Sequence, residues 1–373
     1  MTTLSIVLFT LAVFYFVFLI RIRIGLRKSV KARPSQAQPS VTVIVAARNE
    51  ERLIERCLRS LAAQTYPEHL FEIIVVDDCS TDSTKSILKQ LEAEIPRVTI
   101  LSVGDKGHQS DSRKTQALEL GISRARGEVI LTTDADCVAP PRWVATMAGG
   151  FDNDTAMVVG PVVEEPGTSL LSKISQMEFL GIVTTAGGLV GNGEPIICNG
   201  ANLAFRKTSF QKAGGYGHKN KYVDDEVLMQ RIVYRKVGQV RFCADRAAVI
   251  ATKPVETAEE FWHQRIRWAA KRGTYENKRV FVTLLLIYVS FLAFFTALVM
   301  TVAFPSFALF GGMLLAAKLI AEYQVLFTGA TLFGQHVSFP VFLIAEIIHI
   351  PYVVLAGAAG QFLPKQWKGR TLA

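Results

Sequence analysis

Two aspartates one residue apart, Asp134 and Asp136, have the side chains and the spacing that most directly suggest chemistry. They follow the apolar run Val129–Leu131, which is typical of a buried strand in a parallel sheet. On such a strand the two side chains would share one face, and the carboxyl end of the strand would direct them into the crevice where α/β sheets bind ligands. Paired carboxylates in that place hold a hard divalent cation and leave positions open for phosphates. A polar turn after a strand is the alternative interpretation.

Further strand patterns precede this one, and polar side chains follow them. The sequence predicts strands at 41–47, 72–76 and 98–103, with helical segments between them. Asn49 follows the first strand as the expected N-cap of a helix that runs to about residue 64. Asp77 and Asp78 end the second strand. The alternation of strand and helix favours an open, mostly parallel α/β sheet.

Three later segments carry polar groups that this sheet could present. Lys114 lies at the start of a predicted helix, where it can reach a phosphate or a base, or remain a solvated surface lysine. The strand-like stretch 196–205 is interrupted at Asn199-Gly200. Asp224 and Asp225 begin a helix predicted to run to about residue 236. Asp225 could serve only as a helix cap, but Asp224 can fill that role and leave Asp225 available for chemistry.

Apolar residues gather at the two ends of the chain. Half of the 373 residues are hydrophobic, and Leu4–Ile20 and most of Val280–Phe362 are almost unbroken apolar sequence. The first run is followed and not preceded by basic residues, so we expect an uncleaved anchor with its N-terminus outside and the next domain in the cytoplasm. The predicted division is an anchor at 1–24, a basic linker at 25–40, an α/β domain at 41–274, a C-terminal membrane region at 280–363 and a basic tail at 364–373.

The net charge of +9 is concentrated beside these apolar runs. Basic residues in such places mark the cytoplasmic side and attract anionic lipid headgroups, so we expect a membrane and no nucleic acid as the partner. The five cysteines are odd in number, scattered and without a C-x-x-C pair. They indicate reduced thiols in a cytosolic domain, and neither a disulfide framework nor a zinc site.

The C-terminal apolar region divides into three segments. Residues 280–304 and 340–362 are expected to cross the membrane. Three crossings would leave the basic tail outside, which the distribution of positive charge disfavours. We therefore favour an interfacial or re-entrant segment at 307–327.

Ionisable residues lie inside this apolar region. Lys318 and Glu322 are four residues apart and can pair on one helix face. Glu346 and His349 lie deep in the last segment, where ionisable groups are functional candidates. Pairing with Lys318 inside a helix bundle is the structural alternative.

A helix is predicted just before the second apolar region. It begins with a capping box at 257–260 and carries Gln264, Arg267 and Trp268 in the pattern Q-x-x-R-W. Tryptophan and basic residues beside a membrane span indicate an interfacial helix, so membrane anchoring is an alternative role for Arg267 and Trp268. An apolar stripe within 169–189 predicts a second helix, either on the membrane surface or packed in the core.

In this order and spacing, the motifs resemble a membrane-bound family 2 glycosyltransferase with the GT-A fold, over about Val41–Trp268. The matching elements are Arg48-Asn49-Glu50, Asp77-Asp78, Lys114, Asp134-Ala135-Asp136, Gly200–Arg206, Asp224-Asp225 and Gln264–Trp268. The resemblance implies an α/β fold with a Rossmann-like, mostly parallel sheet, one N-terminal and two to three C-terminal transmembrane helices. Family members usually have Glu-Asp where this chain has Asp224-Asp225, so only the first position departs.

The resemblance also implies roles for individual residues. The residues implied to bind the nucleotide-sugar donor are Ala47, Asn49, Glu50, Asp77, Asp78, Lys114 and Asp134. Asp136, helped by Asp134, would hold Mg²⁺ or Mn²⁺ on the diphosphate, and Asp225 would be the general base. The catalytic residues implied to close over the diphosphate and the acceptor are Gln264, Arg267 and Trp268. The residues implied to contact the acceptor are Cys198, Asn199, Gly200, Asp224 and Trp268.

These residue types suit the transfer of a sugar to a hydroxyl group. The hydroxyl attacks the anomeric carbon while a diphosphate leaves, and a metal ion and Arg267 can neutralise the leaving group. One carboxylate, Asp225, is enough to take the proton from the hydroxyl. A second catalytic carboxylate, which a covalent intermediate would require, is not needed, so we expect inversion at the anomeric carbon.

The favoured function is transfer of one sugar from a UDP-linked donor to a lipid at the cytoplasmic membrane face, as in glycolipid biosynthesis for the cell envelope. The chain is compact and leaves little membrane region for a polymer channel, which resembles ceramide-, hopanoid- and carotenoid-type glucosyltransferases. A processive polysaccharide synthase that extends and exports a glycan shares Q-x-x-R-W and is the alternative enzyme. A non-enzymatic membrane scaffold is disfavoured because all the carboxylates that the family motifs require are present, at positions 77, 78, 134, 136 and 225.

Overall fold

The computed structural model describes residues 2–31, 35, 38–103, 113–216, 225–269, 278–359, 365–367 and 370–372. The chain divides into two compact units, and each is considered by itself. We call them the sheet unit, which comprises residues 26–165 and 185–253, and the helical unit, which comprises residues 1–25, 166–184 and 254–373.

The sheet unit alternates strands and helices along most of its length. Its strands are β1 (Val41–Ala47), β2 (Phe71–Asp77), β3 (Val98–Ser102), β4 (Val129–Asp134), β5 (Cys137–Val138), β6 (Thr155–Val159), β7 (Val162–Glu164), β8 (Leu203–Arg206), β9 (Gln239–Phe242) and β10 (Ile250–Thr252). Its helices are α2 (Ile54–Ala62), α3 (Thr84–Glu94), α4 (Arg113–Arg124), α5 (Trp143–Ala148), α7 (Lys207–Lys212) and α8 (Asp225–Tyr234), and its 3₁₀ turns are η1 (Glu68–Leu70), η2 (Gly200–Asn202) and η3 (Arg246–Ala248).

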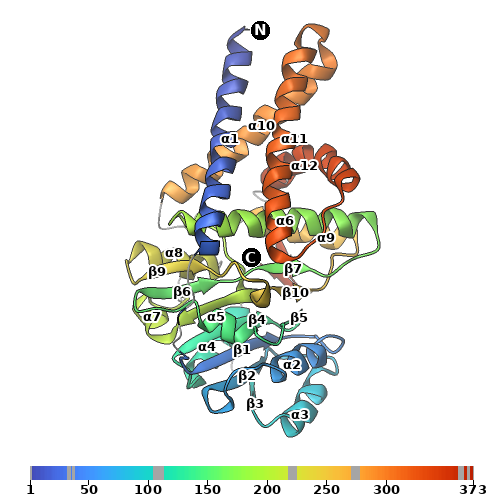
Figure 1. Ribbon diagram of the computed structural model, residues 1–373. Helices are drawn as coiled ribbons and strands as arrows, with labels where there is room; N and C mark the ends of the chain where they lie inside the picture. Colours follow the sequence, from blue (N-terminus) through green and yellow to red (C-terminus); the bar gives the residue numbers. More distant parts are fainter. Residues whose placement is uncertain are drawn as a thin grey trace. The chain divides into compact units, whose positions relative to one another are not determined.

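Seven strands form one mixed sheet in the order β3-β2-β1-β4-β8-β6-β9 (Figure 1). The first four strands in that order are parallel, and β8 runs antiparallel to both of its neighbours. The predicted mostly parallel α/β sheet is therefore confirmed, with strands at the expected places. A second sheet of three short strands has the order β5-β10-β7.

The central strands are buried on both faces, which explains why their sequences are nearly continuous apolar runs. Helix α4 covers β1 and β2 and approaches β1 closely at Gly121. A Cβ atom on Gly121 would lie 2.7 Å from Cγ2 of Ile44, so the helix can pack at this distance because glycine has no side chain.

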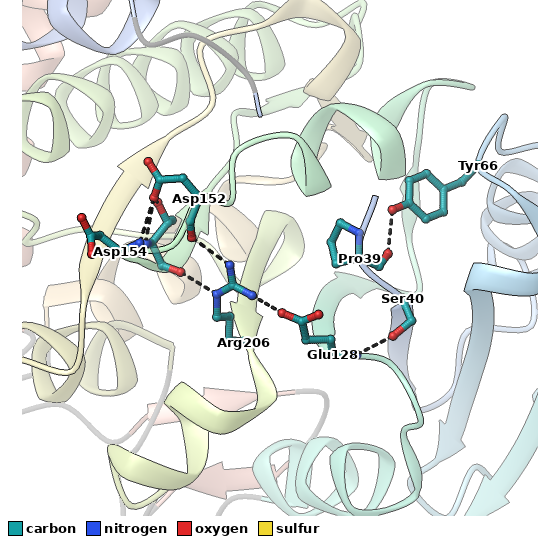
Figure 2. Close-up of polar contacts among 8 residues, drawn as sticks. Pro39, Ser40, Tyr66, Glu128, Asp152, Asp154 and Arg206 are labelled. Atoms are coloured by element: carbon teal, nitrogen blue, oxygen red, sulfur yellow. Dashed lines mark hydrogen bonds and ion pairs between the residues drawn. The ribbon is translucent and has the colours of Figure 1, made fainter. Parts of the chain in front are cut away.

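An arginine holds the end of the sheet at which β4 begins. Arg206, the last residue of β8, pairs in register with Val129 and forms an ion pair with Glu128. Its Nε and Nη2 donate to the carbonyl oxygens of Thr155 (3.1 Å) and Asp152 (2.8 Å) (Figure 2). Three strands are thereby tied together at the end of β4 opposite to Asp134.

The chain that leads into β1 joins the same polar network (Figure 2). The Glu128 N–H donates to Oγ of Ser40 (3.0 Å), and the Tyr66 hydroxyl donates to the carbonyl oxygen of Pro39 (2.6 Å). Burial, and then the negative charge of Glu128, raise the pKa of Tyr66 to about 12, so its hydroxyl remains a donor at neutral pH. These contacts fix the start of the first strand.

The helical unit contains long helices, one shorter helix and two short strands. Its members are α1 (Thr2–Lys31, up to Gly25), α6 (Leu170–Gly191, up to Thr184), α9 (Ala258–Ala269), α10 (Lys278–Ala303), α11 (Pro305–Phe333), α12 (Phe339–Ala359), β11 (Lys365–Trp367) and β12 (Arg370–Leu372). Four of them, α1, α10, α11 and α12, are long and apolar enough to cross a membrane. They mark the chain as a membrane protein, with one N-terminal and three C-terminal apolar helices.

A buried ion network joins these apolar helices. The Lys318 ammonium group is 1% exposed and donates to Glu322 on its own helix (2.8 Å) and to Glu346 on α12 (2.5 Å). The Tyr15 hydroxyl on α1 donates to Glu322 (2.5 Å), and His349 lies 3.5 Å from Glu346. The predicted pairing of Glu346 with Lys318 inside a helix bundle is confirmed. It avoids the free-energy cost of burying an unpaired charge among apolar side chains.

The segment at 307–327, expected to be interfacial or re-entrant, has no re-entrant break and lies within a helix that is long and apolar enough to cross a membrane. Residues 305–333 form one continuous helix of 29 residues. Pro305 occupies its first turn, where a missing N–H is tolerated, and Gly334 ends it with a φ of 69°. Because Lys318 is neutralised internally, its charge does not need to lie at a membrane surface.

A buried asparagine connects the parts of the sheet unit around β8. Asn202 is fully buried, and its Oδ1 accepts from the indole N–H of Trp143 on α5 (2.9 Å). Its Nδ2 donates to the carbonyl oxygens of Pro161 and Ala248 (both 2.7 Å). One amide side chain therefore satisfies three polar groups in the interior.

We expect Asn202→Ala to lower the free energy of unfolding by about 3 kcal/mol, because it removes the Asn202 partner of the buried Trp143 N–H and of the Ala248 carbonyl group, and one of the donors to the Pro161 carbonyl group. Denaturant titration of the purified protein in detergent measures the change. Asn153→Ala is the matched control, since Asn153 is exposed, and should change stability by less than about 0.5 kcal/mol. Equal stability of the two variants would contradict the role given to Asn202.

Candidate functional site

The predicted functional residues of the first half of the chain meet at one edge of the large sheet. Strand β1 lies between β2 and β4, and the three strands are parallel. Ala47 pairs in register with Asp77, and Ala46 pairs with Asp134. The carboxyl ends of the three strands therefore lie side by side, at the place where the sequence order reverses and α/β sheets bind ligands.

The carboxylates that end β2 are buried. Asp77 and Asp78 are each 2% exposed, and Oδ1 of Asp77 accepts from the Ser80 N–H (3.2 Å). The Asp78 N–H donates to the carbonyl oxygen of Ala47 (2.8 Å), so the chain continues the pairing with β1 beyond the strand. Both aspartates are thus placed at the carboxyl edge of the sheet.

The loop after β1 is joined to the loop after β2. Asn49 has a φ of 51°, and its Oδ1 accepts from the Thr81 N–H (2.9 Å). The N–H groups of Asn49 and Glu50 donate to the hydroxyl oxygens of Ser80 (3.1 Å) and Thr84 (2.7 Å). These bonds fasten the two loops to each other beside Asp77 and Asp78.

The prediction that Asn49 is a helix N-cap is wrong. Helix α2 begins only at Ile54, five residues later, and no side chain caps it. The left-handed conformation of Asn49 stops the chain from entering the helix directly, and its amide serves the neighbouring loop instead. The helix also ends at Ala62, before the predicted end near residue 64.

The two aspartates of Asp-Ala-Asp occupy different elements. Asp134 is the last residue of β4, whereas Asp136 lies in the turn before β5. Strand alternation therefore does not apply to Asp136, and the argument that both side chains share a strand face fails. The predicted location at the carboxyl end of the strand is nevertheless confirmed for Asp134.

Lys114 on α4 is paired and is not a solvated surface lysine. Its Nζ lies 2.5 Å from Oδ1 of Asp134, and about a third of each side chain is exposed. Burial alone would lower the pKa of Lys114, but the negative charges of Asp134, Asp225 and Asp136 outweigh it and raise the pKa above its ordinary value. Lys114 therefore stays positively charged among three carboxylates.

A buried thiol, Cys57, is affected by the same carboxylates. Burial raises the pKa of Cys57 above its ordinary range, and the carboxylates of Asp136, Asp134 and Glu50 raise it further. Its Sγ lies 3.5 Å from the carbonyl oxygen of Asp134. Cys57 is therefore a neutral thiol, and Glu50 belongs to the same acidic neighbourhood.

Asp225 is held against the backbone of Gly200. The Tyr216 hydroxyl donates to Oδ1 of Asp225 (2.9 Å), and a Cβ atom on Gly200 would lie 1.9 Å from Oδ2. The Gly200 carbonyl oxygen in turn accepts from the Thr132 hydroxyl on β4 (2.7 Å). Asp225, the first residue of α8, is thereby fixed beside β4. Its negative charge, like that of Asp134, acts on the Lys114 ammonium group.

The residues predicted to contact the acceptor are only partly described. Cys198 is buried, and Oδ1 of Asn199 accepts from the Ala201 N–H (2.9 Å), so Asn199 caps the 3₁₀ turn that contains Gly200. This cap presents Gly200 to Asp225. Asp224 lies outside the described residues.

The Q-x-x-R-W residues belong to the helical unit. They lie on α9, which begins after Thr257 as predicted, with the Thr257 hydroxyl accepting from the Glu260 N–H (3.1 Å). The Trp268 ring stacks on Phe179 of α6, with ring centroids 5.9 Å apart. Gln264 is half-buried, and the backbone of Arg267 continues the helix.

The carboxylates at the sheet edge fit a divalent cation. The Lys114 ammonium group interacts with three carboxylates, those of Asp134, Asp136 and Asp225. These four described residues together carry a net negative charge. Carboxylate oxygens are the ligands that Mg²⁺ and Mn²⁺ prefer. Asp134 and Asp136 therefore have the chemistry to hold such an ion.

Sequence reasoning missed the residues that position the others. Tyr216 falls in what reads as a flexible Gly-Gly-Tyr-Gly turn, and Thr132 and Asn202 read as ordinary members of strand-like runs. The hydrogen bonds of Tyr216 and Asn202 link elements that are brought together only by the fold. No periodicity or motif of the sequence signals these partners.

Two family models match the chain. Glycosyl transferase family 2 matches residues 42–214, and Glycosyl transferase family group 2 matches residues 129–342, which is more than half of the chain. The chain belongs to the family 2 glycosyltransferases. The resemblance inferred from Asp-Ala-Asp and Q-x-x-R-W is thereby confirmed at the level of the family.

Individual relatives agree with this membership of the family 2 glycosyltransferases. The probable glycosyltransferase YdaM of Bacillus subtilis is 28% identical over 278 residues, which cover 70% of this chain and 65% of that protein. A beta-monoglucosyldiacylglycerol synthase of Synechocystis is 26% identical over 256 residues, which cover 64% of this chain and 48% of that protein. The chain thus spans about half to two thirds of the length of these relatives.

A solved structure shares the fold of this family 2 glycosyltransferase. It is a mannosyltransferase from Pyrobaculum calidifontis in complex with GDP-Man and Mn²⁺, with a TM-score of 0.59 and 20% sequence identity. The match covers 96% of this chain and 98% of that one. It confirms the predicted GT-A fold.

We expect Gly200→Ala to lower kcat at least about a hundredfold, because the added methyl group would displace the Asp225 carboxylate by an ångström or more. Steady-state kinetics on detergent-solubilised protein measures the effect. Gly181→Ala on α6 is the matched control, since a Cβ atom there meets nothing within 4 Å, and it should leave kcat within twofold. Wild-type turnover by Gly200→Ala would contradict the placement of Asp225 in the site.

Proposed function

We propose that this chain transfers one sugar from a UDP-linked donor to a hydroxyl group of a membrane lipid, with inversion at the anomeric carbon. The observation that carries the proposal is Asp225, which is held against Gly200 in the same cluster as Lys114 and Asp134. This arrangement brings one carboxylate suited to act as a base next to groups suited to bind a diphosphate.

Asp225 is proposed to take the proton from the acceptor hydroxyl. The Tyr216 hydroxyl fixes one of its oxygen atoms, and the Gly200 backbone limits where the carboxylate can move. A base needs such a fixed position more than an unusual environment, because proton transfer requires contact at hydrogen-bond distance. Direct attack by the activated hydroxyl then displaces the diphosphate in one step.

The leaving diphosphate is proposed to bind at the ends of β1, β2 and β4. Lys114 supplies a fixed positive charge, and Asp77 and Asp78 lie at the edge where the nucleotide would bind. Asp134 and Asp136 would hold Mg²⁺ or Mn²⁺, which neutralises charge on the diphosphate when bound. Gln264, Arg267 and Trp268 would contact the diphosphate and the acceptor from α9.

A lipid acceptor is supported by the apolar helices and by one relative. Four helices are long and apolar enough to cross a membrane, so an acceptor dissolved in the bilayer would be close to the protein. The Synechocystis relative is named as a synthase of beta-monoglucosyldiacylglycerol, a glycolipid. Basic residues after the first apolar helix support a sheet unit on the cytoplasmic face.

Membranes that contain the protein should transfer label from one radiolabelled UDP-sugar, out of a panel of donors, into the organic phase of a solvent extraction. Asp225→Asn should reduce this transfer about a thousandfold, because an amide cannot accept the proton. Asp154→Asn is the control, since Asp154 is exposed at the other end of the sheet (Figure 2). Label in a large water-soluble product would show a polysaccharide synthase instead, and full activity of Asp225→Asn would overturn the mechanism.

Removal of divalent cations by a chelator should abolish transfer, and Mn²⁺ or Mg²⁺ should restore it. Asp136→Asn should raise the Mn²⁺ concentration for half-maximal activity at least about tenfold, because a negatively charged carboxylate ligand is replaced by a neutral amide. Mn²⁺ binding in the presence of UDP, followed by electron paramagnetic resonance, provides a second readout. Chelator-resistant activity, or unchanged Mn²⁺ binding by Asp136→Asn, would contradict the metal site.

A further inference from the structure

Among the side chains of α9 that the structure describes, the most buried polar one is at a position that the Q-x-x-R-W pattern leaves unspecified. Arg265 follows Gln264 directly and is only 3% exposed, whereas Gln264 and Trp268 are half-buried. An arginine is rarely buried to this extent unless its charge is neutralised and its donors are paired.

The partners of Arg265 come from the neighbouring helix of the same unit. Its Nε and Nη2 both donate to Oε2 of Glu178 on α6, at 2.9 and 2.5 Å. Its Nη2 also lies 3.2 Å from the fully buried hydroxyl of Ser175. The guanidinium group is therefore held in a single orientation by two donors on one carboxylate oxygen.

The rest of the guanidinium group contacts the motif itself. Its Nη1 donates to Oε1 of Gln264, and its central carbon lies 4.9 Å from the ring centroid of Trp268. The same guanidinium carbon lies 4.1 Å from the ring centroid of Phe261, one turn earlier on α9. Phe179 stacks on Trp268. Arg265 thus touches both an amide and an indole that are proposed to face substrates.

We infer that Arg265 is a positioning residue for sugar transfer, which sets the orientation of Gln264 and Trp268 through its contacts with both. The inference rests on the proposed function, since it assumes that Trp268 contacts the acceptor. Glu178 and Ser175 contribute to this positioning because they accept hydrogen bonds from Arg265. Lysine cannot replace Arg265, because its ammonium group lacks the planar fork that reaches Glu178 and Gln264 together and stacks on Trp268.

A double-mutant cycle tests whether Arg265 acts through Trp268. We expect Arg265→Lys to lower kcat for transfer roughly tenfold, with the KM for the nucleotide sugar within twofold of wild type. Trp268→Ala should lower it further, and the double variant should be as slow as Trp268→Ala alone, because the residue on which Arg265 acts is gone. Arg59→Lys is the control, since Arg59 is half exposed in a surface ion pair. Multiplicative losses in the double variant would overturn the inference.

A spectroscopic readout separates this inference from the proposed function. In protein labelled with 5-fluorotryptophan, the four tryptophans give four fluorine resonances, and Trp268→Phe identifies one of them. Arg265→Lys should shift that resonance and leave the resonance of the buried Trp143 unchanged. An unmoved Trp268 resonance would overturn the inference even if sugar transfer were observed. Absence of transfer in the wild type, with a shifted Trp268 resonance, would overturn the proposed function and leave only the orientation of Trp268 by Arg265 supported.

Discussion

The parallel pairing of β1 with β2 and β4 is the constraint on which the candidate site depends. It aligns Ala47 with Asp77 and Ala46 with Asp134, so side chains from three separate stretches of sequence lie at one edge. The antiparallel β8 begins at that same edge, which brings the preceding Gly200 next to Thr132. Residues that hold the sheet together, such as Arg206, lie at the opposite end of β4 and leave this edge for chemistry.

The sequence allowed the strands and their carboxyl ends to be predicted, because apolar runs followed by carboxylates have a strong local signal. The positions of Asp77, Asp78 and Asp134 were predicted correctly for this reason. Local signals failed where another element intervened. Asn49 has the chemistry of an N-cap, but the loop after β2 competes for its amide, and a turn interrupts the strand before Asp136. The roles of all these residues in catalysis remain predictions.

The helical unit shows the same division between local and distant contacts. The pair Lys318–Glu322 was predictable from a spacing of four residues on a helix. The contact of Glu322 with Tyr15 joins residues 307 positions apart, and no sequence pattern indicates it. Arg265 and Lys318 illustrate one principle, because each is a buried cation of this unit neutralised by glutamate from its own or a neighbouring helix.

The central claim is that one carboxylate, Asp225, activates the acceptor for a single direct displacement at this edge of the sheet. The anomeric configuration of the product tests this claim most directly. Proton NMR of the glycosylated lipid, made from an α-linked nucleotide sugar, should show a β-linked sugar, because a single displacement inverts the anomeric carbon. An α-linked product would contradict the account, since retention requires a second nucleophile or a different reaction path.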